Sequence, residues 1–393
     1  MQFRARRVDT GQTVVVTVGG HQITGLASIP PAGDEPWVSP GFVDLQINGY
    51  GGREFNDVQL TTEQIESICR SCAAMGVTRF CPTVTTHTFS VMADALQAIA
   101  KACHESPVVA SRVAGIHLEG PYISREDGPR GAHPVGYCRP PDWNEFRQLQ
   151  DAAEGRIRLI TLSPEYPGSG SFVEHAVSSG LVVAIGHTNA TSAQIHEAVE
   201  AGASLSTHLG NGAHAIIRRH PNYIWDQLAE DRLAATLIAD GHHLPAAVVK
   251  SFLRAKGPER CILVSDIVGF AGMSPGIYSS RKAGMIEVLD DGRIVVAGQR
   301  QYLFGAGRAI TYGIANVMRF AELDLATAVE MACGRPATAL GLSGFRLEVG
   351  APADLVLFDL PATEEDPLRI RATLQAGALA YGSLPAAPAS RPS

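Results

Sequence analysis

The sequence predicts an α/β fold, namely a (β/α)8 TIM-like barrel with a small β-sandwich domain formed by the N- and C-terminal segments. Three observations predict it. Eight short apolar runs, rich in β-branched residues and bounded by Gly, Pro or polar residues, are typical of buried parallel strands. Amphipathic stretches between these runs are long enough to be crossover helices. The chain has 393 residues, whereas such a barrel takes about 250, so a surplus remains at both ends.

The eight predicted strands follow one another through the middle of the chain. Arg112–Glu119 shows the pattern, since it is too short for a helix and stops before Gly120-Pro121. The strands are expected at Phe42–Asn48, Thr78–Thr85, Arg112–Glu119, Ile157–Glu165, Leu181–Thr188, Ala203–Gly210, Ala234–Asp240 and Cys261–Ile267. The helices between them are expected at Thr61–Met75, Val91–Cys103, Gly170–Gly180, Ser192–Ala201 and Leu244–Lys256.

Sequence typical of β-strands also flanks the barrel on both sides. These flanking runs are Thr13–Val18, His21–Ile29, Asp354–Asp359 and Arg369–Tyr381. The sequence therefore predicts a β-sandwich from residues 1–39 and 345–383, a barrel from 40–344, and a disordered tail rich in Pro, Ala and Ser at 384–393.

The composition is that of a soluble enzyme. The chain is 45% hydrophobic and 18% charged, and its net charge of −7 gives no general attraction to nucleic acid or to an acidic membrane. The first residues, MQFRARRVDTGQ, hold no apolar signal core, and no run approaches the roughly 20 apolar residues that span a bilayer. We therefore expect a cytoplasmic protein without a nucleic-acid or membrane partner.

The sequence gives little support for a cysteine-based zinc site or for a nucleotide-binding motif. The only close cysteine pair, Cys69 and Cys72, lies in a predicted helix without a second pair that would complete a zinc site, which favours a packing role. A P-loop is absent, and no Gly-x-Gly-x-x-Gly opens a helix after the first strand, so the sequence gives no indication of nucleotide binding.

Metal-competent side chains close three of the predicted strands. Glu119, His187 and His208 end the third, fifth and sixth strands, so a barrel would bring them together at its carboxyl face. Hydrolytic zinc sites usually take three such ligands and keep one position open for water. A single histidine at a strand end is more often a hydrogen-bonded structural group. Here three metal-competent residues each end a predicted barrel strand, and this shared position favours a metal site.

Asp266 ends the eighth predicted strand, at the same face of the barrel. A carboxylate there can take a proton from the attacking water and later hand it to a leaving amine. A fourth metal ligand and the N-cap of the following segment are the alternative roles.

Around these residues the chain resembles a known family. Matching segments are PGFVDLQINGYGG at 40–52, GVTRFCPTVTT at 76–86, HLEGPYIS at 117–124, GAH at 131–133, GHTNA at 186–190, THLGN at 207–211, IADGHH at 238–243, LVSD at 263–266 and GAPADLVLFD at 350–359. They resemble the amidohydrolase superfamily and, within it, the N-acetylglucosamine-6-phosphate deacetylases. Many amidohydrolases bind two metals through a first-strand His-x-His and a carboxylated lysine, whereas this chain has Gln46 and Asn48 on the first strand.

The resemblance implies a single divalent metal ion, with zinc expected and Fe²⁺ or another divalent ion as the alternative. Glu119, His187 and His208 would be its ligands, and Asp266 the catalytic acid and base. The resemblance also implies an amino-sugar substrate and a homodimer, in which an arginine of one subunit can reach the phosphate bound by the other. The implied substrate-binding residues are Ala132, His133, Asn211, Gly212, Arg219, His243, Leu303, Phe304 and Gly305.

Several of these assignments leave alternatives open. His242 competes with His243 for the substrate-contacting position, and Arg219 lies in a basic turn that could simply be solvated. His117 is either an outer group of the metal site or a buried core histidine. The segment after His208 lacks the tyrosine of the family's H-L-Y-N-A-M pattern.

The expected reaction is removal of the N-acetyl group from N-acetylglucosamine-6-phosphate, giving glucosamine-6-phosphate and acetate. A different N-acyl sugar, an N-acyl amino acid or a non-catalytic barrel scaffold are the alternatives.

Overall fold

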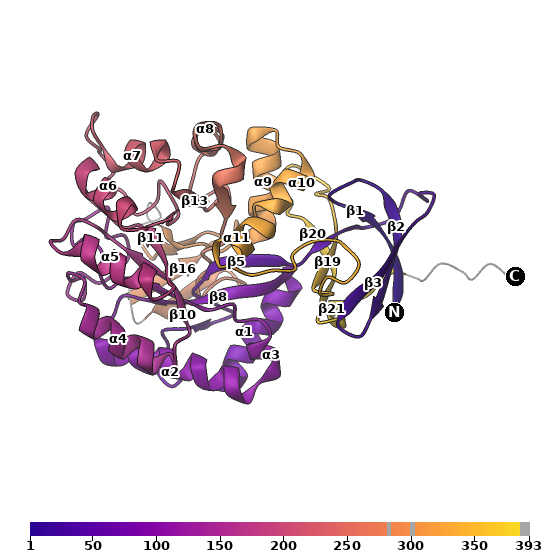
Figure 1. Cartoon of the computed structure of the whole chain (residues 1–393), viewed down its shortest axis with the longest axis horizontal. Helices are drawn as coiled ribbons and strands as arrows, with labels where there is room; N and C mark the ends of the chain where they lie inside the picture. The colour runs from indigo at the N-terminus through magenta and orange to yellow at the C-terminus, as the bar shows by residue number, and fades with distance from the viewer. Residues whose placement is uncertain (281–283, 299–302, 386–393) are drawn as a thin grey trace, which may run out of the picture.

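The computed structural model describes residues 1–280, 284–298 and 303–385 and confirms the predicted barrel (Figure 1). Its eight parallel strands are ordered β14-β13-β12-β11-β10-β9-β8-β5. They are β5 (Phe42–Ile47), β8 (Val77–Thr85), β9 (Ile116–Glu119), β10 (Ile157–Leu162), β11 (Val182–Ile185), β12 (Leu205–Ser206), β13 (Ala234–Leu237) and β14 (Cys261–Leu263). A parallel bridge between Ile47 and Ile267 joins the first strand to the chain beyond the last one, which closes the barrel.

Helices surround the strands, and the five predicted ones are present with slightly shifted ends (Figure 1). Thr61 and Thr191 begin two of them with a capping box, in which the threonine side chain and a glutamine three residues later satisfy exposed backbone N–H groups. The helices are α1 (Thr62–Ala74), α2 (Phe89–Glu105), α3 (Pro107–Ala110), α4 (Trp143–Ala152), α5 (Ser169–Ser178), α6 (Ser192–Glu200), α7 (Tyr223–Ala229), α8 (Ala246–Lys256), α9 (Ile310–Ala321), α10 (Leu325–Glu330) and α11 (Gly334–Ala339). Within the described ranges, none of them is long and apolar enough to cross a membrane.

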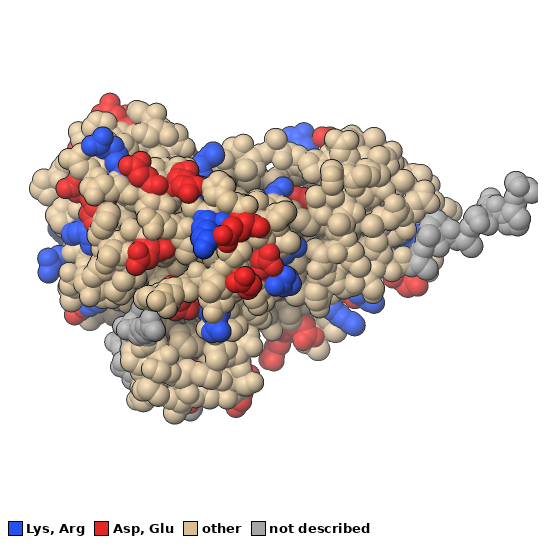
Figure 2. All heavy atoms as spheres, turned by 90° about the horizontal axis from the view of Figure 1, so that it is seen from below, with Lys and Arg blue, Asp and Glu red and all other residues tan. Residues whose placement is uncertain are grey.

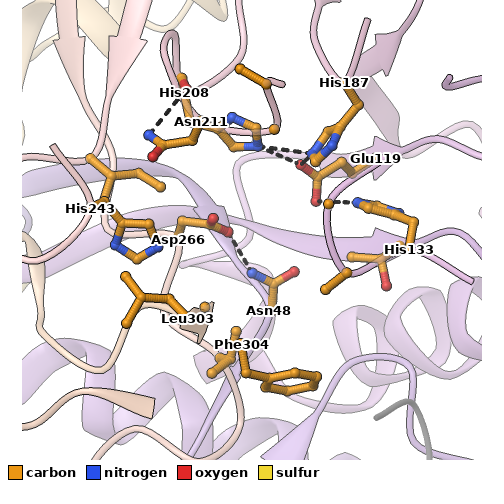
Figure 3. Close-up of a pocket in the computed structure, with 18 of the residues that line it drawn as sticks. Asn48, Glu119, His133, His187, His208, Asn211, His243, Asp266, Leu303 and Phe304 are labelled. Carbon is orange, nitrogen blue, oxygen red and sulfur yellow. Dashed lines mark hydrogen bonds and ion pairs between the residues drawn. The ribbon is translucent and has the colours of Figure 1, made fainter. Parts of the chain in front are cut away.

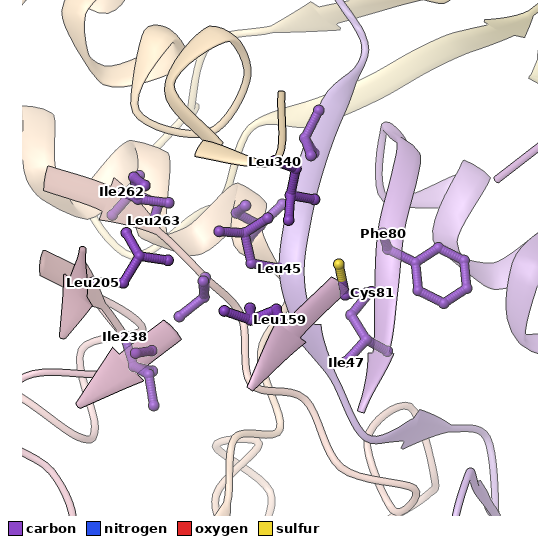
Figure 4. Packing of buried hydrophobic residues seen from close by; sticks show 14 of the residues in the cluster. Leu45, Ile47, Phe80, Cys81, Leu159, Leu205, Ile238, Ile262, Leu263 and Leu340 are labelled. Atoms are coloured by element: carbon purple, nitrogen blue, oxygen red, sulfur yellow. The ribbon is translucent and has the colours of Figure 1, made fainter. Parts of the chain in front are cut away.

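The barrel is filled by apolar side chains from strands that are distant in the sequence. Leu45, Leu159, Leu205 and Leu263 are each at most 3% exposed and belong to one buried cluster (Figure 4). Cys69 and Cys72 on α1 are also buried in this cluster as free thiols, which agrees with a packing role. This rigid core holds the strand ends in place.

The two chain ends pair with each other in a second, seven-stranded sheet of order β21-β20-β19-β4-β1-β2-β3. Its strands are β1 (Gln2–Arg7), β2 (Thr13–Gly19), β3 (Gln22–Ser28), β4 (Trp37–Pro40), β19 (Leu355–Asp359), β20 (Arg369–Gln375) and β21 (Ala378–Gly382). Strand β4 pairs antiparallel with β19, and a separate apolar core lies against this sheet. Leu384 packs on that core, whereas 386–393 of the expected disordered tail lie outside the described residues. The domain boundaries at residues 39/40 and 344/345 stay a prediction.

A third sheet follows the last barrel strand and was not predicted. It contains β15 (Gly276–Ser280), β16 (Gly284–Val288), β17 (Ile294–Val296) and β18 (Leu303–Gly305) in sequence order. A short pair, β6 (Gly49–Tyr50) and β7 (Arg53–Glu54), follows the first barrel strand. Both additions lie on the carboxyl side of the barrel, because the chain enters them after it leaves the carboxyl ends of β5 and β14.

Charged side chains of both signs lie on the surface of the molecule. Figure 2 shows acidic and basic side chains interspersed over one face of the molecule, with no region there dominated by a single sign. Several are paired across short distances, as in the Arg232–Glu200 contact of 2.8 Å.

Candidate active site

The four residues singled out by the sequence lie together at the carboxyl face of the barrel (Figure 3). Glu119 is the last residue of β9, as predicted. His187, His208 and Asp266 were expected inside strands but follow them by two or three residues. The reason is their backbone, since their φ angles of 50°, 29° and 52° are left-handed and incompatible with a strand. Such conformations cost about 1 to 3 kcal/mol each and cluster at functional sites.

Three potential ligand atoms converge at the centre of this face. Nε2 of His187 and Nε2 of His208 lie 3.2 and 3.1 Å from Oε1 of Glu119, and the two nitrogens are 3.0 Å apart. All three side chains are buried, with at most 7% of each residue exposed. One carboxylate and two imidazoles facing one another at these distances match the donor set of a hydrolytic zinc site.

Neighbouring groups orient two of these ligands. Nδ1 of His187 lies 2.8 Å from the carbonyl oxygen of Pro129, so it carries the proton and leaves the Nε2 lone pair free for a metal. Gln46 donates from Nε2 to Oε1 of Glu119 over 2.9 Å. Burial raises the pKa of Glu119, but the close contacts with the His187 and His208 imidazoles outweigh burial and hold the pKa of this carboxyl well below its usual range. The site therefore presents an anionic carboxylate.

His133 forms a second, overlapping group with the same carboxylate. Ligand atoms of Glu119, His133 and His187 all lie within 4.8 Å of one another. The contact of His133 is looser, since its Nε2 is 4.0 Å from Oε2 of Glu119 and its Nδ1 is 2.8 Å from Oγ1 of Thr86. Both groups share Glu119 and His187, so the cluster is a candidate site for a divalent metal ion whichever histidine completes it.

Asp266 faces this cluster from the opposite side of the pocket. Asn48 donates a hydrogen bond from Nδ2 to Oδ1 of Asp266 over 2.7 Å (Figure 3). Burial, followed by the charge of Glu119, raises the pKa of Asp266 to about 6, while His208, His243 and the Asn48 hydrogen bond act in the opposite direction. A carboxyl group titrating near neutrality can both accept and return a proton, which is what a general base and acid requires.

A pocket of about 370 Å³ opens around these residues. The predicted residues that line it are Asn48, Glu119, Ala132, His133, His187, His208, Asn211, Gly212, His243, Asp266, Leu303, Phe304 and Gly305. It is also lined by residues that sequence reasoning missed, namely Glu54, Thr85, Gly131, Pro134, Gly210, Ala213, Ile238 and Val268. Glu54 was missed because it sits on the two-residue strand β7, which leaves no periodic signal.

Other predicted residues lie away from the pocket wall. Arg219 is exposed and is not among the lining residues of this chain. His242 directs Nε2 to the carbonyl oxygen of Asp291 at 3.2 Å, so of the two neighbouring histidines it is His243 that lines the pocket. His117 lies in the barrel interior, 2.7 Å from Oγ1 of Thr161, and burial lowers its pKa to about 4. This geometry is that of a neutral, hydrogen-bonded core histidine.

Comparison with known proteins identifies relatives over most of the chain. The N-acetylglucosamine-6-phosphate deacetylase of Bos taurus is 32% identical over 363 residues, which cover 88% of this chain and 83% of that protein. The N-acetylgalactosamine-6-phosphate deacetylase of Shewanella sp. (strain ANA-3) is 32% identical over 349 residues, covering 87% of this chain and 82% of that protein. The resemblance expected from the sequence motifs is therefore confirmed.

Solved structures agree with the sequence relatives. A mutant N-acetyl-D-glucosamine-6-phosphate deacetylase from Mycobacterium smegmatis, in complex with N-acetyl-D-glucosamine-6-phosphate, has a TM-score of 0.85 at 28% identity and covers 97% of this chain and 99% of its own. The N-acetylglucosamine-6-phosphate deacetylase of Thermotoga maritima has a TM-score of 0.83 at 25% identity, with 96% and 99% covered. The amidohydrolase family model matches residues 37–382. With this match along almost its whole length, the chain belongs to the amidohydrolase family.

Proposed function

We propose that this chain is a metal-dependent deacetylase that hydrolyses N-acetylglucosamine-6-phosphate to glucosamine-6-phosphate and acetate. The observation that carries the proposal is the convergence of Glu119, His187 and His208 within 3.2 Å, with Asp266 across the same pocket. The names of the curated relatives support the choice of an N-acetyl-amino-sugar phosphate as substrate. The two together favour hydrolysis of a linear amide over a non-catalytic scaffold.

The metal is proposed to be a single zinc ion held by Glu119, His187 and His208, with Fe²⁺ as the alternative. When bound, such an ion supplies a Lewis acid that polarises the acetyl carbonyl and lowers the pKa of a coordinated water to about 7. The tighter distances to His208 favour it over His133 as the third ligand. His133 is then proposed to form a hydrogen bond with the substrate.

Asp266 is proposed to move the protons of the reaction. It takes a proton from the attacking water as the new C–O bond forms on the acetyl carbon. When the C–N bond breaks, Asp266 returns this proton to the sugar nitrogen, which leaves as an amine. Asn48 holds one oxygen of the carboxylate in place during both steps.

Phosphate recognition is proposed to need a second subunit. Arg219 is exposed and lies away from the pocket of its own chain, in a loop that follows the pocket residues Asn211 and Gly212. A homodimer would let Arg219 reach the pocket of its partner, where a planar guanidinium can bind phosphate through two parallel hydrogen bonds. An Arg219→Ala variant is then expected to raise KM for the phosphorylated sugar strongly.

A cytoplasmic location stays a prediction from the sequence.

The function is tested by acetate release from N-acetylglucosamine-6-phosphate and from unphosphorylated N-acetylglucosamine, with Asp266→Asn as the control for contaminating activity. Fast turnover of the phosphorylated sugar, lost in Asp266→Asn, is the expected result. The 4-epimer, N-acetylgalactosamine-6-phosphate, belongs in the same assay because one relative carries that name. Turnover of the 4-epimer alone would move the assignment to a different N-acyl sugar. Inactivity of metal-loaded protein on all three would refute a deacetylase of these sugars.

A further inference from the structure

A buried carboxylate, Asp240, lies behind the pocket wall at the turn that follows strand β13. Its Oδ1 accepts hydrogen bonds from the backbone N–H groups of His242 and His243, at 2.8 and 2.9 Å. Its Oδ2 lies 2.8 Å from Nδ1 of His243. Both carboxylate oxygens are therefore directed at the short segment that presents His243 to the pocket.

The arrangement fixes the protonation site of the His243 ring. Asp240 is ionised, because its contacts with His243 and the two backbone N–H groups lower its pKa in spite of burial. An ionised carboxylate only accepts, so Nδ1 of a neutral His243 must carry the proton. The lone pair then lies on Nε2, at the other side of the ring. His243 lines the pocket together with Asp266, and Figure 3 shows the two side chains near each other.

The turn itself is held from outside the barrel. Asn316 donates from Nδ2 to the carbonyl oxygen of Ala239 at 2.8 Å. Arg308 donates to the carbonyl oxygens of Asp240 and Asp291, at 3.1 and 3.2 Å. Asp291 lies between strands β16 and β17, so Arg308 ties this turn to the inserted sheet whose last strand also lines the pocket. These bonds hold the backbone of the turn in place, and with it the Asp240 carboxylate that contacts the His243 imidazole.

We propose that Asp240 is a positioning residue that locks His243 in the Nδ1-protonated tautomer, so that Nε2 accepts a hydrogen bond from a substrate hydroxyl. Among the described residues, Asp240 is the one ionised side chain with a hydrogen bond to the His243 ring. The role of the hydroxyl rests on the proposed sugar substrate, whereas the tautomer does not. Asp240 acts through His243 and has no direct part in bond making.

The tautomer is tested first, on the wild-type protein without substrate. Histidine ¹⁵N chemical shifts report which ring nitrogen carries the proton, and His243→Asn identifies the signal by removing it. We expect His243 to be protonated at Nδ1 in wild type and to lose this preference in Asp240→Asn. A wild-type His243 protonated at Nε2 overturns the proposal, even if Asp240→Asn does not fold.

Kinetics of the metal-loaded variants supply the second test. We expect Asp240→Asn to keep its metal and to lose about 10- to 100-fold in kcat/KM, a loss of the size found when the hydrogen-bond partner of a metal-ligating histidine is removed. The double variant Asp240→Asn with His243→Asn should be no slower than His243→Asn alone, because Asp240 acts only through that ring. Multiplicative losses in the double variant overturn the proposal.

A matched Asp→Asn control is available at Asp324, which caps helix α10 by accepting from the backbone N–H of Thr327 at 2.9 Å. Asp324→Asn should leave the His243 signal and kcat/KM unchanged. If the wild type released no acetate from any of the sugars, the proposed function would fail, while the ¹⁵N measurement would still decide the role of Asp240.

Discussion

Asn48 and Asp266 are 218 residues apart in the chain, yet the Asn48 amide donates a 2.7 Å hydrogen bond to the Asp266 carboxylate. The bond joins the segment after the first barrel strand to the segment after the last. Beside it, the backbone N–H of Asp266 donates to the carbonyl oxygen of Gln46 at 3.0 Å. The contacts that close the barrel between its first and last strands therefore also orient the carboxylate of the proposed base.

Replacing Asn48 by alanine should shift the pH dependence of the reaction. The Asn48 hydrogen bond lowers the pKa of Asp266, so its loss should raise that pKa, by about one unit for a bond to a charged group. Because the base must be ionised, kcat/KM should begin to fall at a higher pH on acidification. The measurement is a pH profile of kcat/KM for both proteins with equal metal content. An acid limb that stays in place, or moves to lower pH, would contradict this role.

Replacing Gly212 by alanine should damage the metal cluster. A Cβ at this position would lie 2.8 Å from Nδ1 of His187, and the φ angle of 56° already disfavours a side chain. His187 would have to move, which would break its contact with the Pro129 carbonyl. Metal analysis of purified protein should show a clear loss of bound ion. Gly155→Ala, at a similarly left-handed glycine with open space around its Cβ, is the control and should retain the metal.

Lys256 is expected to stabilise helix α7 from within the protein. Its side chain is fully buried, and Nζ lies 2.7 Å from the carbonyl oxygen of Gln227 and 2.5 Å from that of Glu230. Lys256→Met would leave these carbonyls at the helix end without their donor, which should lower the free energy of unfolding by about 2 to 3 kcal/mol. Urea denaturation measures it. Lys250→Met, which removes the surface pair with Glu322, should cost less than about 1 kcal/mol.

Asp44 should make stability depend on pH. Burial raises the pKa of this carboxyl to about 7, against hydrogen bonds from Ser265 and Gln46 that lower it. The folded protein therefore binds this proton more tightly than the unfolded chain. Protonation of Asp44 therefore adds to the free energy of unfolding. This contribution is fully present below the unfolded pKa of about 4 and is lost as the pH rises to 7, by up to about 1.4 kcal/mol per pH unit.

Asp44→Asn separates this contribution from all others. The neutral amide cannot titrate, so the free energy of unfolding of the wild type relative to the variant should fall steadily between pH 4 and pH 7. Urea denaturation at several pH values measures the difference. A constant difference across this range would show that Asp44 does not carry a raised pKa in the folded protein.

The barrel could be predicted because its strands are apolar runs bounded by Gly, Pro or polar residues, and because the barrel topology brings their carboxyl ends together at one face. Glu119 shows how far this extends, since a strand-end residue was placed at the centre of the pocket from sequence alone. The inserted sheet was missed for the opposite reason. Its strands are three to five residues long and separated by Gly and charged residues, too short for an alternating pattern to stand out.

The finer features of the site depend on backbone geometry that no residue pattern encodes. The left-handed conformations of His187 and Asp266 end their strands early, and only the three-dimensional structure shows this. The proximity of His133 to Glu119 depends on the path of a long loop after β9. The carboxylate of Asp240 could have been suspected from its position beside His242 and His243, but its bond to the ring depends on the turn at Gly241.

The central claim is that one metal ion lies between Glu119, His187 and His208, and anomalous diffraction from crystals of metal-loaded protein tests it most directly. The predicted result is a single strong peak at the absorption edge of the bound metal, within about 2.0 to 2.2 Å of a Glu119 oxygen and of Nε2 of both His187 and His208. A peak bound by His133 in place of His208, or no peak at this cluster in protein that hydrolyses the sugar, would contradict it.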